Sequence, residues 1–200
     1  MSFYGWLKNG NERIKYTWLP HSSGVLLIHA SAVIVNNHGF IFLGPSGTGK
    51  STICSILESE TIKIADDRVC LIPNQGSWAI SSADDYNFTD RISEEQVVKM
   101  EKHPLKGILR LYRGTQPKTI PTPSFQTFQN LFVSYFEFKL HVCCSLKDRK
   151  NVFSTLASIA RAVRGYSFYF NCSFFTVQVF NEMLNQDFSL GAQHKAIITI

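Results

Sequence analysis

The sequence predicts an α/β fold, in which a phosphate-binding loop (P-loop) joins a buried strand to a helix within a mixed β-sheet flanked by helices. Residues 44–51 read GPSGTGKS and match the pattern G-x-x-x-x-G-K-S/T. The apolar run Gly39–Leu43 before the loop is typical of a buried strand, and Thr52–Leu57 after it has the apolar spacing of a helix that packs on a sheet. Further strand-like and helix-like segments follow, as expected of an α/β domain.

The first half of the chain predicts short strands around this loop. Residues 25–35 and 39–43 are apolar and flank Asn36-Asn37-His38, which predicts a hairpin turn. Downstream we expect a strand at 62–65, a second at 69–72, a turn at 74–77 and a third strand at 78–81. The polar segment 82–91 predicts a mobile loop at the site, and its acids are Asp84, Asp85 and Asp90. These acids either include a metal ligand or are solvated loop charges, and we favour solvated charges.

The second half predicts two more strands and several helices. Residues 107–112 form the strand, and either Arg110 within it or Arg113 at its end could neutralise phosphate charge. Three prolines at 117, 121 and 123 predict an extended linker. The later segments are a helix at 124–138, a helix at 151–163, a strand at 166–170, a helix at 174–184 and an apolar tail at 196–200 that could add a strand to a neighbour. Phenylalanines recur at helical spacing along 124–138, which indicates packing or a subunit interface.

Composition indicates one domain. The chain has 200 residues, of which 44% are hydrophobic and 18% charged, enough to bury one sizeable core. We expect residues 24–200 to form this domain after an N-terminal extension at 1–23. Residues 1–20 lack the apolar core of a secretory signal, and no run of about twenty apolar residues occurs. The sequence therefore predicts a cytoplasmic protein with no membrane partner.

The net charge and the cysteines exclude several classes of protein. The net charge is +5, but the only dense basic group, Lys147, Arg149 and Lys150, is typical of a solvated helix start, so no nucleic-acid partner is expected. The cysteines are odd in number and show no C-x-x-C spacing, which argues against a disulfide framework and a zinc site. They are expected to be reduced and mostly buried, and are Cys54, Cys70, Cys143, Cys144 and Cys172.

The loop motif carries the strongest functional signal. Its glycines let backbone N–H groups turn towards anionic oxygens, the following helix adds its positive end, Lys50 can reach the outer phosphates and Ser51 can ligate Mg²⁺. An ordinary glycine-rich turn is the less favoured interpretation. No Asn-Lys-x-Asp motif is present to read guanine, so ATP is the expected nucleotide. The residues expected to bind it are Gly44, Pro45, Ser46, Gly47, Thr48, Gly49, Lys50, Ser51 and Thr52.

Asp66 and Asp67 are the second signal, because they follow the predicted strand at 62–65. Phosphate transfer needs one carboxylate for the Mg²⁺ ion and its water shell, and another that accepts the proton of the attacking hydroxyl. Neighbouring side chains point to opposite faces of an ideal strand, so both acids reach one site only if the chain bends there. The alternative is a solvated turn in which Asp67 pairs with Arg68.

Three segments, in this order and spacing, resemble the C-terminal catalytic domain of HPr kinase/phosphorylase and its relatives, which share a phosphoenolpyruvate carboxykinase-like P-loop fold. The segments are Ile28–Ala32 (IHASA), the loop at 44–51 and Ile64–Val69 (IADDRV). Weaker similarity at 103–109 and 156–170 extends the resemblance over roughly residues 24–185. The relatives phosphorylate a serine of the HPr carrier protein, free serine, or a serine of a ribosomally made peptide such as a lasso-peptide precursor. The resemblance implies a serine kinase that uses ATP and Mg²⁺.

The resemblance also implies individual roles. Asp66 would accept the proton of the acceptor hydroxyl, while Lys50 and the loop amides hold the β- and γ-phosphates. Ser51 and Asp67 would serve the Mg²⁺ ion. His29 either donates to a γ-phosphate oxygen or is a satisfied core histidine, as is common on an apolar strand. A homo-oligomer is expected because oligomers are usual among the relatives.

The chain departs from HPr kinases in two segments. It lacks the Glu-x-Arg-Gly-x-Gly segment with which they hold a second metal and engage HPr, and it lacks their later arginine-bearing loop. We therefore expect neither HPr as the substrate nor reverse phosphorolysis, and the acceptor is a serine-containing peptide, a small protein or free serine. Peptide-modifying relatives carry additional residues before the IHASA strand, so we expect such an N-terminal domain to be missing or reduced. The alternative function is a nucleotide-binding regulatory or accessory module with weak ATPase activity and no phosphoacceptor.

Overall fold

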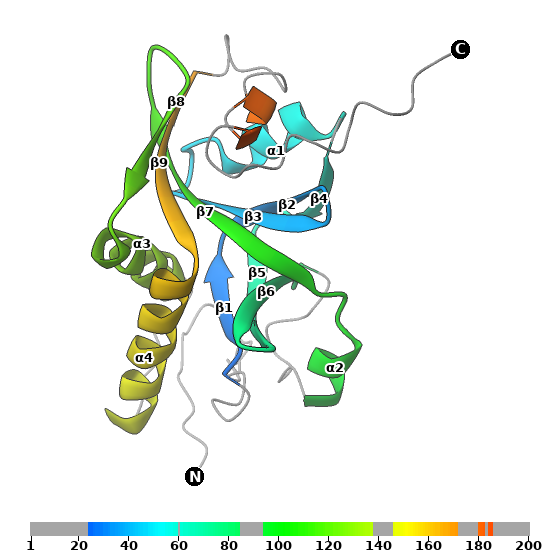
Figure 1. Ribbon diagram of the computed structural model, residues 1–200, viewed down its shortest axis with the longest axis vertical. Helices are drawn as coiled ribbons and strands as arrows, with labels where there is room; N and C mark the ends of the chain where they lie inside the picture. Colours follow the sequence, from blue (N-terminus) through cyan, green and yellow to red (C-terminus); the bar gives the residue numbers. More distant parts are fainter. Residues whose placement is uncertain are drawn as a thin grey trace, which may run out of the picture.

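A computed structural model describes residues 24–59, 61–84, 94–137, 146–171, 180–182 and 184–185. These residues form a curled, mixed β-sheet with flanking helices, which confirms the predicted fold class (Figure 1). The strands are β1 (Leu26–His29), β2 (Ser31–Val35), β3 (His38–Leu43), β4 (Ile62–Ala65), β5 (Arg68–Asn74), β6 (Ser77–Ser82), β7 (His103–Arg113), β8 (Lys118–Thr122) and β9 (Arg164–Phe170). The helices are α1 (Lys50–Leu57), α2 (Glu94–Lys99), α3 (Ser124–Glu137) and α4 (Leu146–Ala162).

Strand β7 joins the antiparallel strands β1, β5 and β6 to the strands that surround the P-loop, β3, β2, β4, β9 and β8. Near its start it pairs with β6 in antiparallel fashion, and further along it lies parallel between β3 and β9. The strand order is β1-β5-β6-β7-β3-β2-β4, with β9 paired to both β7 and β8. In Figure 1, β1, β5 and β6 lie below β7, whereas α1 lies above it. Because β3 and β7 are parallel, their carboxyl ends meet at one edge, where the P-loop begins.

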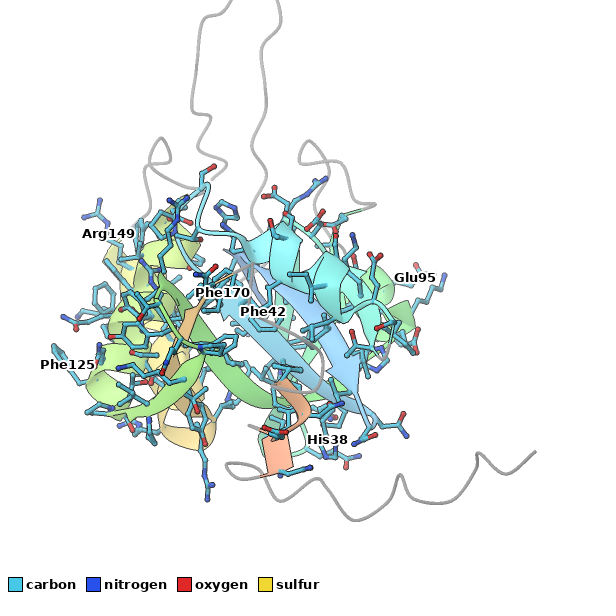
Figure 2. The ribbon with its side chains drawn as sticks, turned by 90° about the horizontal axis from the view of Figure 1, so that it is seen from above. His38, Phe42, Glu95, Phe125, Arg149 and Phe170 are labelled. Carbon is cyan, nitrogen blue, oxygen red and sulfur yellow. The ribbon has the colours of Figure 1, made fainter. Side chains whose placement is uncertain are left out.

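The two largest apolar clusters lie on opposite faces of the sheet, and β3 contributes to both. Its side chains alternate, so that Ile41 and Leu43 join the cluster beneath α3 and α4, while Phe40 and Phe42 join the cluster beneath α1. All four are fully buried. Figure 2 shows Phe42 and Phe170 at the centre of the molecule and Phe125 at its periphery. A strand covered on both faces explains why this segment is apolar without polar alternation.

The predicted strand at 25–35 is wrong in one respect, because it is two strands. β1 pairs with β5, whereas β2 pairs with β3 and β4, and the change of partner falls at Ala30. The N–H of Ala30 donates instead to the carbonyl of Asp67, at 3.1 Å. The hairpin between β2 and β3 is confirmed, but its turn is the pair Asn36 and Asn37, both with positive φ, and His38 already belongs to β3.

The predicted linker around Pro117, Pro121 and Pro123 is also wrong in part, since residues 118–122 form β8 and pair with β9. Among the described residues β8 pairs with no second strand, and an edge strand tolerates proline. The helix at 124–138 is confirmed as α3, with Phe128, Phe132 and Phe136 packed against the core, although Phe125 is 70% exposed. The helix predicted at 151–163 begins earlier, at Leu146.

Several predictions fall partly or wholly outside the described residues: the N-terminal extension at 1–23, the tail at 196–200, most of the helix at 174–184 and the cysteines at 143, 144 and 172. Within the described chain, Cys54 and Cys70 are free and buried, and burial raises the pKa of each thiol to about 12. Both match the expected buried, reduced thiols, and the raised pKa makes them poor nucleophiles. No helix in the described ranges is long and apolar enough to cross a membrane.

Candidate active site

The P-loop has the backbone that its glycines predict. Gly47 and Gly49 have φ angles of 78° and 98°, in the left-handed region. A Cβ on Gly49 would also lie 2.7 Å from Cζ of Phe170, so this position excludes a side chain both by conformation and by space. Thr48 closes the loop, since its backbone N and its Oγ1 donate to the carbonyl of Pro45 at 3.2 and 2.7 Å.

Helix α1 presents its positive end to this loop. Gly49 is the N-cap and provides no side-chain cap, and the first turn contains no acidic residue. The first N–H groups of a helix have no partner within the helix, and the helix dipole adds positive potential there. Ser46, Ser51 and Thr52 are exposed around this end of the helix. The loop and the start of α1 together can bind an anion such as a phosphate.

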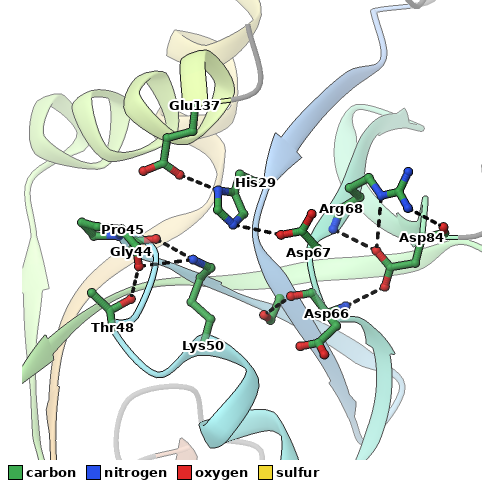
Figure 3. Close-up of polar contacts among 11 residues, drawn as sticks. His29, Gly44, Pro45, Thr48, Lys50, Asp66, Asp67, Arg68, Asp84 and Glu137 are labelled. Atoms are coloured by element: carbon green, nitrogen blue, oxygen red, sulfur yellow. Dashed lines mark hydrogen bonds and ion pairs between the residues drawn. The ribbon is translucent and has the colours of Figure 1, made fainter. Parts of the chain in front are cut away.

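Lys50, the first residue of α1, lies against the loop (Figure 3). Its residue surface is 7% exposed, and Nζ donates to the carbonyl of Gly44 at 2.7 Å and to that of Pro45 at 3.4 Å. Burial lowers the pKa of the Lys50 ammonium, while the negative charges of Glu137, Asp67 and Asp66 oppose this shift. These carboxylates therefore lie close enough to act on Lys50.

The chain bends at Asp66 and Asp67, as the two-acid hypothesis requires. β4 ends at Ala65 and β5 begins at Arg68, so neither acid lies within a regular strand. The bend is held through the main chain: Ser31 Oγ donates to the carbonyl of Asp66 at 2.5 Å.

Asp84 fixes the same bend, which sequence reasoning did not foresee. Its carboxylate accepts from the backbone N–H of Asp66 at 2.7 Å and from that of Arg68 at 2.9 Å. The guanidinium of Arg68 in turn donates to the carbonyl of Asp84 at 2.7 Å. The favoured interpretation of Asp84 as a solvated loop charge is therefore wrong, because its carboxylate satisfies two backbone donors. Asp85 and Asp90 lie outside the described residues.

Replacing Asp84 with Ala should lower the free energy of unfolding by about 1–3 kcal/mol, since two partly buried N–H groups lose their acceptor. Asn retains one acceptor oxygen, so Asp84→Asn should lose less. Denaturant unfolding monitored by circular dichroism measures both. Glu101→Ala is the control, because Glu101 is 85% exposed and contacts only His103 among the salt bridges of the described chain. Equal stability of the Asp84→Ala and Glu101→Ala variants would contradict the role given to Asp84.

The side chains of Asp66 and Asp67 have different surroundings. Oδ1 of Asp66 is buried and has no hydrogen-bond partner among the described residues, while Oδ2 lies 3.8 Å from Nζ of Lys63. Oδ1 of Asp67 lies 3.0 Å from Nε2 of His29. The ion-pair partner of Asp67 is therefore His29, and not Arg68 as the alternative prediction had it. The two acids therefore have different neighbours.

His29 lies between two carboxylates. Besides the contact with Asp67, its Nδ1 lies 2.8 Å from Oε2 of Glu137, at the C-terminal end of α3 (Figure 3). The His29 side chain is 17% exposed and that of Glu137 is 24% exposed. Glu137 is absent from the sequence-based site, since no motif or spacing connects the end of a phenylalanine-rich helix to the loop.

Both candidate arginines lie near the loop. Arg113 Nη2 donates to the carbonyl of Gly47 at 3.3 Å. Arg110 pairs in register with Leu43, the last residue before the loop, and its charge also lowers the pKa of Lys50. Nη1 of Arg110 is buried and has no hydrogen-bond partner in the described part of the chain.

The structure thus brings His29, Lys50, Asp66 and Asp67 together at the P-loop, which is the geometry of a P-loop α/β protein. The sequence model of the SynChlorMet cassette protein ScmC matches residues 14–184, and the chain belongs to this ScmC family. Among curated proteins none matches the chain.

The HPr(Ser) kinase/phosphatase from Coxiella burnetii is a solved structure to which the chain is similar. The TM-score is 0.46 with 11% sequence identity, over 80% of this chain and 88% of that chain.

Proposed function

We propose that this protein is a Mg²⁺- and ATP-dependent kinase that transfers the γ-phosphate of ATP to a serine hydroxyl. The observation that carries the proposal is Asp66: a carboxylate with a buried Oδ1, unpartnered among the described residues, whose charge acts on the P-loop lysine. A module that only binds nucleotide needs no proton acceptor beside the phosphates. The choice of serine, rather than another hydroxyl, is supported by the resemblance of the IHASA and IADDRV segments to serine kinases.

The residues at the P-loop fit a nucleoside triphosphate. Nη1 of Arg110 is a buried donor without a partner among the described residues, and it lies on the strand that ends beside the loop. An anionic ligand at the loop would supply the missing acceptor. Gly47 has no atom within 4 Å of where a Cβ would stand, so this part of the loop is open to a ligand.

The proposed roles follow from these contacts. Lys50 would release the carbonyls of Gly44 and Pro45 and donate to the β- and γ-phosphates instead. The backbone amides of residues 44–52 would bind the same phosphates. The hydroxyl oxygen of the acceptor serine forms a bond to the γ-phosphorus, its proton passes to Asp66, and the bond between the γ-phosphorus and the bridging oxygen breaks to release ADP. Ser51 and Asp67 would hold Mg²⁺, which neutralises phosphate charge when bound. Arg110 and Arg113 would neutralise the remaining charge.

Ser51 and Asp67 are the proposed Mg²⁺ ligands. No cluster of three or more His, Cys, Asp or Glu side chains able to hold a metal occurs in the described ranges. That is compatible with Mg²⁺, which keeps several waters and takes only one or two protein carboxylates together with substrate phosphates.

The test is intact-mass analysis of acceptors incubated with the protein, ATP and Mg²⁺. The panel contains free serine and serine-containing peptides, including peptides that end in serine, with matched peptides in which alanine replaces serine. We expect a gain of one phosphoryl group on a serine acceptor, and none on its alanine counterpart. Transfer to no acceptor, with ATP bound tightly, would favour the alternative of a nucleotide-binding regulatory module.

A further inference from the structure

Glu137 is a charged residue of α3 that lies beside a candidate site residue. Its Oε2 lies 2.8 Å from Nδ1 of His29, and its side chain is 24% exposed. Oε2 is buried and has no hydrogen-bond partner among the described residues, so the contact with His29 is an electrostatic one. A largely buried carboxylate placed against His29 points to a role in the site.

We propose that Glu137 is a positioning residue, which holds the imidazole of His29 so that Nε2 faces Asp67 and the phosphate site. This inference rests on the proposed function. The two contacts lie on different ring nitrogens, Nδ1 with Glu137 and Nε2 with Asp67. The χ2 angle of a histidine is soft, so two carboxylates at different ring nitrogens restrain the orientation of the ring more than either does alone.

The position of Glu137 is itself fixed by packing. α3 lies on β1, the strand that ends in His29, and it buries Leu131, Ser134 and Tyr135 in the turns before Glu137. Leu131 and Tyr135 are no more than 1% exposed and share a core cluster with Ile28, the neighbour of His29. The carboxylate is therefore carried by a rigid element, as precise orientation of a site residue requires.

Glu137 also affects the charge at the loop. It is the largest of the charges that raise the pKa of Lys50, against the lowering caused by burial. The same negative charge acts unfavourably on phosphates bound beside Lys50. Removing the charge of Glu137 should therefore separate two quantities: the turnover falls because His29 loses its support, while ATP affinity does not fall.

Glu137→Gln tests this, with Glu95→Gln as the matched control, since Glu95 is 77% exposed on α2 and pairs with Lys99. We expect Glu137→Gln to lower kcat by about 10- to 100-fold, the usual effect of losing an outer support of a site residue. The KM for ATP should stay equal or fall, and Tm should not decrease. A simple loss of structure would instead raise KM and lower Tm.

A double-mutant cycle separates action through His29 from independent action. If Glu137 acts through His29, Glu137→Gln should change kcat little once His29 is replaced by Gln. Additive losses in kcat, or an unchanged kcat in the single variant, would overturn the proposal.

A second measurement does not depend on activity. Nitrogen-15 NMR of the His29 imidazole should show altered ring signals in Glu137→Gln and unaltered ones in Glu95→Gln. If the wild-type protein phosphorylates no acceptor, the proposed function fails, yet the contact is still tested by these signals and by the ATP affinity. Unchanged His29 signals in Glu137→Gln would overturn the positioning role even in an active kinase.

Discussion

Replacing Asp66 with Asn is expected to lower the rate of phosphate transfer by on the order of 10²- to 10⁴-fold and to leave ATP affinity nearly intact. Asn has the same size but cannot accept the proton of the attacking hydroxyl. The fold should tolerate the change, because the bend is held by the main chain of Asp66, through Asp84 and Ser31, and not by its carboxylate. Single-turnover transfer and equilibrium ATP binding measure the two quantities.

Glu58→Gln is the matched control for this experiment. Like Asp66, Glu58 contacts Lys63, at 3.2 Å, but it lies at the far end of α1 from the loop. It should keep wild-type transfer. If Asp66→Asn transferred phosphate as fast as the wild type, the base would be assigned to the wrong residue, and Asp67→Asn would be the next variant to measure.

The parts of the fold that sequence reasoning predicts are those with local causes. The loop at 44–51 follows from glycines that alone adopt the required backbone, and α3 follows from its apolar spacing. The strand break at Ala30 has no local cause, since both halves of 25–35 are apolar and only the identity of the partner strands changes. Likewise β8 forms despite Pro121 because β9 offers a partner.

The residues of the candidate site likewise divide into those with a local sequence signal and those without one. Lys50, Asp66, Asp67 and His29 belong to segments whose composition is itself a signal, and the structure brings them to one place. Glu137 and Asp84 act only through tertiary approach: one is carried to His29 by the packing of α3 on β1, and the other reaches back across 18 residues to the N–H of Asp66. Neither residue differs in sequence from an ordinary surface acid, so a single sequence cannot select them.

Replacing Lys50 with Ala is expected to damage ATP binding and turnover together, in contrast to Asp66→Asn. The ammonium would contact the phosphates in both the ground state and the transition state, so its loss should weaken ATP binding and lower the turnover. Loss of a charged hydrogen bond of about 1.5–3 kcal/mol corresponds to roughly a 10- to 100-fold weaker ATP affinity. Isothermal titration with ATP, followed by the acceptor assay, measures the two effects.

Two comparisons make the Lys50 result decisive. Lys50→Met keeps the apolar stem but removes the donor that holds the carbonyls of Gly44 and Pro45, so a similar loss in both variants would assign the effect to the charge rather than to packing. Lys63→Ala removes a lysine that pairs with Glu58 and faces Asp66, outside the P-loop, and it should bind ATP as the wild type does. If Lys50→Ala also bound ATP normally, the loop at 44–51 would not be the nucleotide site, and the roles of Asp66, His29 and Glu137 would lose their common basis.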